Sequence, residues 1–211
     1  MISNHDNFVF DLGGVVFTID RDICVGRLDA LGLADAARLL DLYCQSGDFL
    51  SLEQGAISAG EFFDILRHRC TRSDVTDAEL TEALGSFITG LPVRRLAALR
   101  RLREMGKKVY ALSNTNPIMF HTVIDRLFRQ EGLSALDYFD GMVLSFQEKV
   151  CKPDPEIFDI LTRRYGLDGG RTLFLDDSPA NCEAAARLGI DSLLIPENAD
   201  FIDVLGLDHV N

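Results

Sequence analysis

The sequence predicts an α/β protein with a doubly wound parallel sheet, and three features of the 211-residue chain support this fold class. Short apolar runs recur along the chain, bounded by Gly, Asn, Asp or Pro, as in strands that are buried on both faces. Amphipathic helical segments alternate with these runs, which is the order of strand–helix–strand units with right-handed crossovers. Polar residues follow directly after the apolar runs, where ligands bind in open α/β sheets.

Buried strands are expected wherever β-branched and aromatic residues form such a run. They lie at residues 8–10, 109–112, 142–144, 172–175 and 190–195. One helix should begin after Pro92 and end at Gly106, because Pro favours the first helical turn and Gly the position after the last one. Ser178 and Pro179 provide a similar start for a helix that ends at Gly189.

The segment 17–90 separates the first two strands and is much longer than a single crossover requires. It contains no convincing strand pattern, whereas Thr76 and Glu79 form a capping-box pattern before an apolar run. Amphipathic helices are expected at residues 23–31, 34–43, 59–69 and 77–87. We therefore expect an α/β core at residues 1–16 and 91–211, with a helical cap inserted at residues 17–90.

The composition is that of a globular protein, with 47% apolar and 26% charged residues. Thirty-three acidic and 21 basic side chains give a formal net charge of −12, which disfavours nucleic acid or an anionic membrane as the main partner. No apolar run reaches the ~20 residues of a membrane span. The expected partner is therefore a small molecule, and nothing in the sequence indicates the oligomeric state.

The N-terminus lacks the basic segment and long apolar run of a signal peptide. The cysteines are odd in number, widely spaced and without a CxxC pair, which is typical of thiols in a reducing compartment. They are Cys24, Cys44, Cys70, Cys151 and Cys182. The expected location is cytoplasmic.

Polar residues that follow the predicted strands should converge on one edge of the sheet. Three carboxylates are suited to a hard cation, while a hydroxyl and one of only four lysines are suited to an anion. These residues are Asp11, Ser113, Asn114, Lys152, Asp176 and Asp177.

Four segments around these residues resemble the motifs of the haloacid dehalogenase superfamily, in the family's order and spacing. The segments are FDLGGVV at 10–16, LSNTN at 112–116, KPDPEIF at 152–158 and FLDDSPANCEAAARLG at 174–189. EQGAISAGEFF at 53–63 resembles the helical cap of family phosphatases that act on sugar phosphates. The overall pattern is similar to the bacterial α-D-glucose-1-phosphate phosphatase-like subgroup. The resemblance implies Mg²⁺-dependent hydrolysis of a small phosphorylated metabolite, with a sugar phosphate as the favoured substrate.

The resemblance also implies roles for individual residues. Asp11 would be the nucleophile that forms an aspartyl-phosphate. Mg²⁺ would be held by Asp11, the backbone carbonyl of Gly13 and the two acids of the fourth motif. Of these two acids, Asp177 is favoured as the direct ligand and Asp176 as a bridge through water or Lys152. Phosphoryl oxygens would be bound by Ser113 and the backbone N–H of Asn114, with Lys152 as the fixed countercharge.

Position 13 departs from the family pattern. Family phosphatases usually carry a second aspartate there, which protonates the leaving group and then activates water. Gly13 retains the carbonyl for the metal but offers no proton, and such acid–base help is worth roughly 10²–10⁴ in rate.

Three hypotheses follow from this departure. The chain is a phosphatase with a comparatively acidic leaving group, in which water or a cap residue replaces the missing acid; Asp20, Glu53 and His68 are unranked candidates. Alternatively it is a pseudo-enzyme that binds phosphate or a metabolite. The third hypothesis, 2-haloacid dehalogenation, needs no leaving-group proton, but it is metal-independent and leaves the pair Asp176 and Asp177 without a role.

Overall fold

A five-stranded parallel sheet forms the centre of the computed structural model, which describes residues 2–40, 46–197 and 199–207. The strands are ordered β5-β4-β1-β6-β7, and each neighbouring pair is parallel. Their bounds are β1 (Asn7–Phe10), β4 (Lys108–Ser113), β5 (Gly141–Leu144), β6 (Thr172–Asp176) and β7 (Asp191–Leu194). The predicted α/β fold and its five strands are confirmed.

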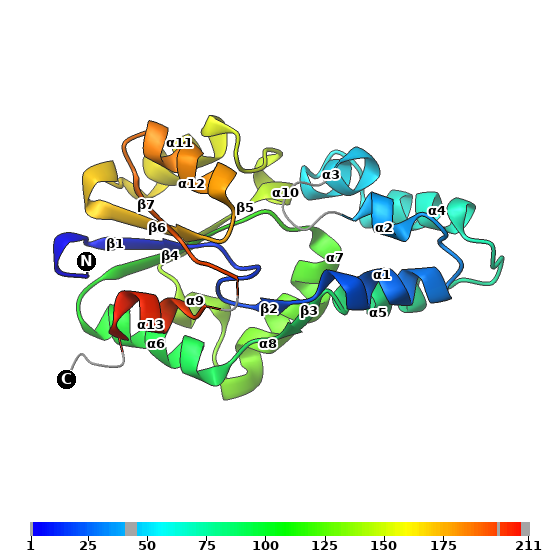
Figure 1. Cartoon of the computed structure of the whole chain (residues 1–211), viewed down its shortest axis with the longest axis horizontal. Helices are drawn as coiled ribbons and strands as arrows, with labels where there is room; N and C mark the ends of the chain where they lie inside the picture. The colour runs from blue at the N-terminus through cyan, green and yellow to red at the C-terminus, as the bar shows by residue number, and fades with distance from the viewer. Residues whose placement is uncertain (1, 41–45, 198, 208–211) are drawn as a thin grey trace.

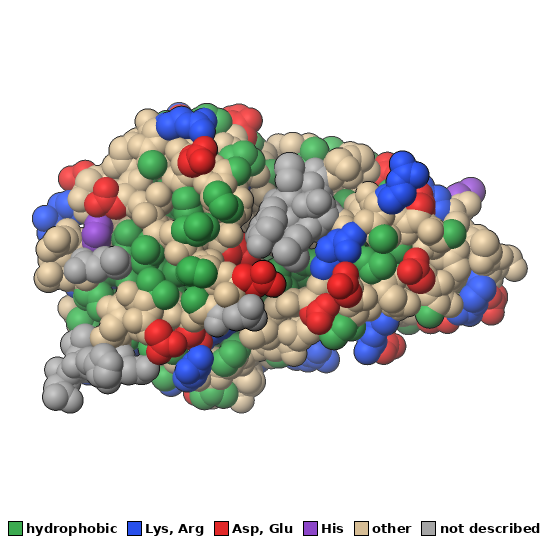
Figure 2. All heavy atoms as spheres, in the orientation of Figure 1, with side chains coloured by type: hydrophobic (Ala, Val, Ile, Leu, Met, Phe, Trp, Pro, Cys, Tyr) green, Lys and Arg blue, Asp and Glu red, His purple; other side chains and the backbone are tan. Residues whose placement is uncertain are grey.

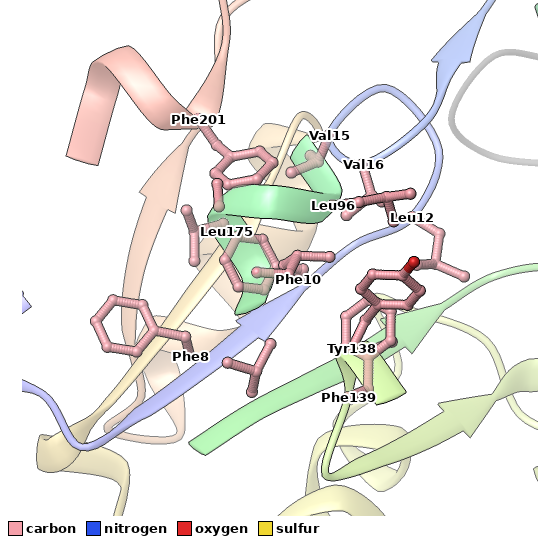
Figure 3. Packing of buried hydrophobic residues seen from close by; sticks show 14 of the residues in the cluster. Phe8, Phe10, Leu12, Val15, Val16, Leu96, Tyr138, Phe139, Leu175 and Phe201 are labelled. Atoms are coloured by element: carbon pink, nitrogen blue, oxygen red, sulfur yellow. The ribbon is translucent and has the colours of Figure 1, made fainter. Parts of the chain in front are cut away.

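Helices cover both faces of this sheet, as Figure 1 shows. On one face lie α6 (Val93–Glu104) and α13 (Phe201–Leu205), and on the other α11 (Pro155–Tyr165) and α12 (Pro179–Arg187). Side chains of a strand alternate between its faces. Phe8 and Phe10 therefore pack with the α6 and α13 residues, including the ring of Phe201 at a centroid distance of 4.9 Å from Phe10 (Figure 3). Val9 points the other way, into a cluster with Phe158 and Ala185.

The segment between β1 and β4 contains a second bundle of helices with its own apolar cluster. The helices are α1 (Arg21–Ala30), α2 (Ala36–Leu39), α3 (Gly47–Glu53), α4 (Ala59–Arg69) and α5 (Asp77–Gly85). They project from one end of the sheet (Figure 1). Phe49 of α3 and Phe62 of α4 stack edge to face at 4.8 Å between ring centroids. The capping box predicted at Thr76 and Glu79 is present at the start of α5.

The structure corrects the expectation that segment 17–90 contains no strand. β2 (Thr18–Ile19) and β3 (Ile88–Gly90) form a short antiparallel ribbon. Strands this short carry no detectable alternation, and the pairing joins residues that are distant in sequence. The helix α3 was also not predicted. Within the helix expected at 34–43, Leu40 already has extended backbone angles, and residues 41–43 lie outside the described residues.

Short elements complete the chain. They are η1 (Ile2–Asn4), α7 (Pro117–Met119), the π-helix η2 (Phe120–Ile124), α8 (Asp125–Phe128), η3 (Arg129–Glu131), α9 (Ala135–Tyr138), α10 (Ser145–Glu148) and η4 (Gly169–Arg171). The stretch from α7 to α8 belongs to both apolar clusters, because Ile118 and Met119 pack with the inserted helices whereas Ile124 and Phe128 pack beneath the sheet. It thereby joins the two parts.

Two findings bear on the predicted cellular setting. Among the described residues, no two cysteines form a disulfide, and Cys44 lies outside these residues. No described helix has both the length and the apolar character that crossing a bilayer demands.

Candidate active site

The carboxyl ends of the three central strands bring the predicted polar residues together. Asp11 follows β1 directly, and its backbone N–H donates a hydrogen bond to Leu175 O of the neighbouring strand at 2.8 Å. Ser113 is the last residue of β4, and Asp176 is the last residue of β6. Since β4, β1 and β6 are adjacent and parallel, these residues end at the same edge.

Lys152 lies at the centre of this edge, with its side chain only 1% exposed. Its Nζ is 2.8 Å from Asp11 Oδ1 and 2.6 Å from Asp176 Oδ2. Burial acts to lower the pKa of Lys152, but these two carboxylates outweigh it and hold the pKa above its ordinary value. The lysine is therefore charged, and it partly neutralises the acids beside it.

The side chain of Asn114 holds the backbone of Lys152 in place. Asn114 Nδ2 donates to Lys152 O at 2.9 Å, and Lys152 N donates to Asn114 Oδ1 at 2.8 Å. This double hydrogen bond ties the loop after β4 to the Lys152–Pro153 turn, whose peptide bond is cis. The amide thus positions the lysine that stands opposite the two acids.

Asp176 is fully buried, and both of its carboxylate oxygens already have protein partners. Oδ1 accepts hydrogen bonds from Ser178 N at 2.8 Å and from Asn181 Nδ2 at 3.0 Å, while Oδ2 accepts from Lys152. Asp177 is more open and lines the pocket above the strands. This arrangement suits Asp177 to a ligand position and Asp176 to the anchoring of Lys152.

The three carboxylates form a cluster that fits a divalent cation. Asp11, Asp176 and Asp177 each offer an oxygen, and these oxygens all lie within 4.8 Å of one another. Burial raises the pKa of Asp11 to about 8 and that of Asp177 to about 6, and Asp176 adds to both shifts. The site therefore has more carboxylate groups than Lys152 can balance. Oxygen ligands with excess negative charge are the environment that Mg²⁺ requires.

The loop after β1 passes so close to Asp177 that only glycine fits at position 14. Gly14 has φ +73°, and a Cβ at this position would lie 2.0 Å from Asp177 Oδ2. At Gly13, by contrast, a Cβ would lie 3.9 Å from Ile19 Cγ2, an ordinary van der Waals distance. The structure would thus accommodate a Cβ at position 13. In the sequence, the only indication of this close approach is the pair of consecutive glycines at positions 13 and 14.

A pocket lies between the sheet edge and the inserted helices. Its lining from the core side includes Asp11, Gly13, Asn114, Lys152 and Asp177, together with Thr115, Asn116, Met119, Ser178 and Asn181. The inserted segment contributes Ile19, Leu40, Phe49, Glu53 and Phe87. Most of the predicted site residues therefore share one pocket.

Two predicted residues lie behind the pocket lining. Ser113 is buried, and its Oγ donates to Asn114 O at 3.3 Å; Asp176 lies beneath Lys152. The prediction had not included Ser178 and Asn181, which bind Asp176. The sequence feature that could have indicated these two residues is their position at the start of the helix that follows β6.

The three candidates for a replacement acid lie in very different places. Asp20 is exposed and caps α1 by accepting hydrogen bonds from the N–H groups of Asp22 and Ile23. His68 is exposed on α4, with Nδ1 2.7 Å from Asp64 O. Glu53, at the end of α3, lines the pocket, where burial raises its pKa to about 7 against the opposing effect of Lys152.

Comparison with known proteins agrees with this geometry. The family model of haloacid dehalogenase-like hydrolases matches residues 5–189. D-Ribitol-5-phosphate phosphatase of Bacteroides thetaiotaomicron is 39% identical over 195 residues, covering 92% of this chain and 94% of that protein.

Solved structures show the same similarity. A haloacid dehalogenase family enzyme from Bacteroides thetaiotaomicron, in complex with magnesium and inorganic phosphate, superposes with a TM-score of 0.88 at 34% identity, covering 95% of this chain and 98% of that chain. A HAD-like family hydrolase from Porphyromonas gingivalis gives a TM-score of 0.88 at 30% identity, covering 99% and 100%. The chain belongs to the haloacid dehalogenase-like hydrolase family.

Proposed function

We propose that the chain is a Mg²⁺-dependent phosphatase of a small phosphorylated polyol or sugar. The observation that carries this proposal is the cluster of Asp11, Asp176 and Asp177 with Lys152 at the floor of a pocket that the inserted helices cover. The relative's activity suggests ribitol 5-phosphate as the first ester to test. A sugar phosphate such as glucose 1-phosphate, favoured by the sequence pattern, is the second.

In the proposed reaction, the carboxylate of Asp11 attacks phosphorus and forms an aspartyl-phosphate, which water then hydrolyses. Lys152 holds the nucleophile through its 2.8 Å contact with Oδ1 and supplies positive charge for the phosphoryl oxygens. The backbone N–H of Asn114 is a further proposed phosphate contact. Ser113 is another, although its Oγ lies behind the lining and would have to turn away from Asn114 O to reach the phosphate. When bound, Mg²⁺ would be held by Asp11, the Gly13 carbonyl and Asp177, with Asp176 anchoring from below, and would offset the charge of carboxylate and phosphate.

The proposal assigns different tasks to the two parts of the chain. Residues 1–16 and 91–211 would form the catalytic core, and residues 17–90 would form a cap that selects the substrate and excludes water. A small phosphorylated metabolite, rather than nucleic acid or membrane, is the proposed partner, in the cytoplasm. On the face drawn in Figure 2, acidic and basic side chains are interspersed over both parts, the pattern of a solvated surface.

Gly13 favours a second candidate function, a module that binds phosphate but turns it over poorly. The two functions are separated by release of phosphate from a panel of alkyl, sugar and aryl phosphates, with Mg²⁺ or with EDTA. We expect Mg²⁺-dependent release, and a loss of at least about 10³-fold in Asp11→Asn, since the amide is no nucleophile. Asp203→Asn, the same change at an exposed position of α13, should retain full activity. Binding of Mg²⁺ and phosphate without release from any ester would instead identify a binding module.

A further inference from the structure

The geometry of phosphoryl transfer defines where a proton is needed. The attacking and leaving oxygens lie roughly in line on opposite sides of phosphorus. Asp11 attacks from the sheet edge, so the leaving oxygen departs on the side of the inserted helices. Gly13 carries no side chain that could reach it, although a Cβ there would be accommodated at 3.9 Å from its nearest neighbour.

The end of α3 is the part of the inserted segment that meets the core beside this pocket. Gly55, with φ +58°, approaches the backbone of Phe146 so closely that a Cβ would lie 2.3 Å from Phe146 O. Phe146 belongs to α10, and Figure 1 shows α3 beside α10. This backbone contact fixes the C-terminal end of α3 against the core and places Glu53 in the pocket lining.

Glu53 is the one titratable side chain that the described part of segment 17–90 contributes to this lining. The core contributes Asp11, Lys152 and Asp177, of which Lys152 is paired with Asp11. Glu53 is therefore the acid on the part of the lining that the inserted segment contributes, the side toward which the leaving oxygen departs.

We propose that Glu53 is the catalytic residue that protonates the leaving group and then activates the hydrolytic water, in place of the acid absent at position 13. This inference rests on the proposed phosphatase function. It assigns the acid–base step to the inserted segment, so the site is chemically complete only when α3 is docked on the core.

The two half-reactions balance around Glu53. In the first, an Asp11 oxygen bonds to phosphorus, the bond from phosphorus to the ester oxygen breaks, and the departing oxygen takes the proton of the Glu53 carboxyl. In the second, water bonds to phosphorus from the same side, the bond to the Asp11 oxygen breaks, and the proton of the water passes to the Glu53 carboxylate. The products are an alcohol and inorganic phosphate, and Glu53 is protonated again.

The ionisation of Glu53 agrees with this cycle. Burial raises its pKa to about 7, and the charge of Lys152 opposes the shift. A carboxyl group that titrates near neutrality is present in both forms at working pH, as alternating acid and base roles require.

Rapid-quench kinetics of Glu53→Gln test the inference. With an alkyl ester such as ribitol 5-phosphate, the first turnover should slow by roughly 10²-fold or more, because glutamine cannot supply a proton. With 4-nitrophenyl phosphate, whose leaving group needs no proton, the first turnover should change little. Its later turnovers should slow, so that nitrophenol appears as a burst of one equivalent per site. Glu82→Gln, the same change at an exposed residue of α5, should behave as wild type.

Two further readouts separate proton transfer from a structural role. In wild type, kcat/KM for the alkyl ester should decline above about pH 7, where Glu53 loses its proton. This decline should disappear in Glu53→Gln. In ¹³C NMR of protein labelled at the glutamate carboxyl, the signal lost in this variant should titrate near 7 in wild type.

Three results would overturn the inference: equal slowing of the first turnover of both esters, an effect on KM alone, or a Glu53 signal that titrates near 4. Absence of nitrophenol release by the wild-type enzyme would count against the phosphatase function itself, so the two failures are distinguishable.

Discussion

A single buried lysine organises the charges of the site. Lys152 contacts both Asp11 and Asp176, and Asn114 holds its backbone through two hydrogen bonds. A buried charge is tolerated only when it is paired, so each of these groups depends on the others. The sequence indicated that Asp11, Lys152 and Asp176 would meet, because each follows a predicted strand of one parallel sheet. It did not indicate that Asn114 would bind the lysine backbone.

Gly14 provides a residue-scale test of the metal site. In Gly14→Ala the new Cβ would overlap Asp177 Oδ2, so the Asp177 carboxylate must leave its present place in the cluster. We expect Mg²⁺ affinity to fall by about 10-fold or more, since displaced ligands weaken metal binding. Isothermal titration calorimetry of the metal-free protein with Mg²⁺ measures the change.

Gly166→Ala is the matched control for this substitution. Gly166 also has positive φ, at +64°, but in the described part of the chain a Cβ there meets nothing within 4 Å. It should cost about 1 kcal/mol of stability from backbone strain alone and leave Mg²⁺ affinity unchanged. Equal Mg²⁺ affinity in both variants would mean that Asp177 does not help to hold the metal.

At the scale of elements, the length of the apolar pattern in a strand or helix determined whether the sequence could predict it. β1, β4 and β6 are apolar on both faces and stand between clear turn residues, and the sequence located each of them within a residue. β2 and β3 are too short to show a pattern, and they are defined by pairing with each other. The α3 helix lies in a sequence rich in Gly, Ser and Gln, which conceals its apolar positions.

The placement of the candidate acids could not be predicted for a related reason. Asp20, Glu53 and His68 are equally plausible from sequence, because the orientation of the inserted helices depends on contacts such as that between Gly55 and Phe146. Once α3 is placed, only Glu53 of these three lines the pocket.

This docking contact gives an element-scale prediction. In Gly55→Ala, the Cβ would overlap Phe146 O, and the backbone would have to abandon φ +58° or move away from α10. The end of α3 should therefore shift, and phosphate release from alkyl esters should fall by roughly 10-fold or more, because misplaced catalytic groups lose rate steeply. The measurement is steady-state kinetics on alkyl and aryl phosphates.

Gly47, at the other end of the same helix, supplies the control. It has φ +57°, and a Cβ there meets no described residue within 4 Å. Gly47→Ala therefore introduces the same backbone strain without the clash, and it should retain activity. If both variants lose activity equally, strain in α3 rather than its contact with α10 is responsible.

At the scale of the whole molecule, the acidic residues occur in two environments, the solvated surface and the candidate active site. Most of the 33 acidic residues are exposed or paired with arginine at the surface, whereas Asp11, Asp176 and Asp177 are gathered at the sheet edge, and Glu53 lines the same pocket. The net charge of −12 therefore disfavours polyanions as partners without disfavouring a small phosphate ester at this site. The fold accepts this concentration of buried acids because apolar clusters stabilise both sides of the pocket.

The raised pKa of Glu53, a half-buried residue of the pocket lining, should make the stability of the whole protein depend on pH. Its pKa is about 7 in the folded protein and ~4.3 when unfolded, so between these values the folded state holds a proton that the unfolded state has lost. The resulting stabilisation is full below the unfolded pKa and disappears as the pH rises through about 7. Between about pH 5 and about pH 8, the free energy of unfolding of wild type should therefore fall by roughly 2 kcal/mol relative to Glu53→Gln.

Urea unfolding of both proteins in EDTA, at several pH values, measures this difference. Asp11 and Asp177 titrate in both proteins, so their contributions largely cancel when the two free energies are subtracted. Glu82→Gln should show no such pH-dependent difference, because Glu82 is exposed and makes only a surface ion pair with Arg27. A difference between wild type and Glu53→Gln that stays constant across this range would show that Glu53 ionises as it does in water. The inserted helices would then leave that carboxylate hydrated, and the acid for the leaving group would have to be water.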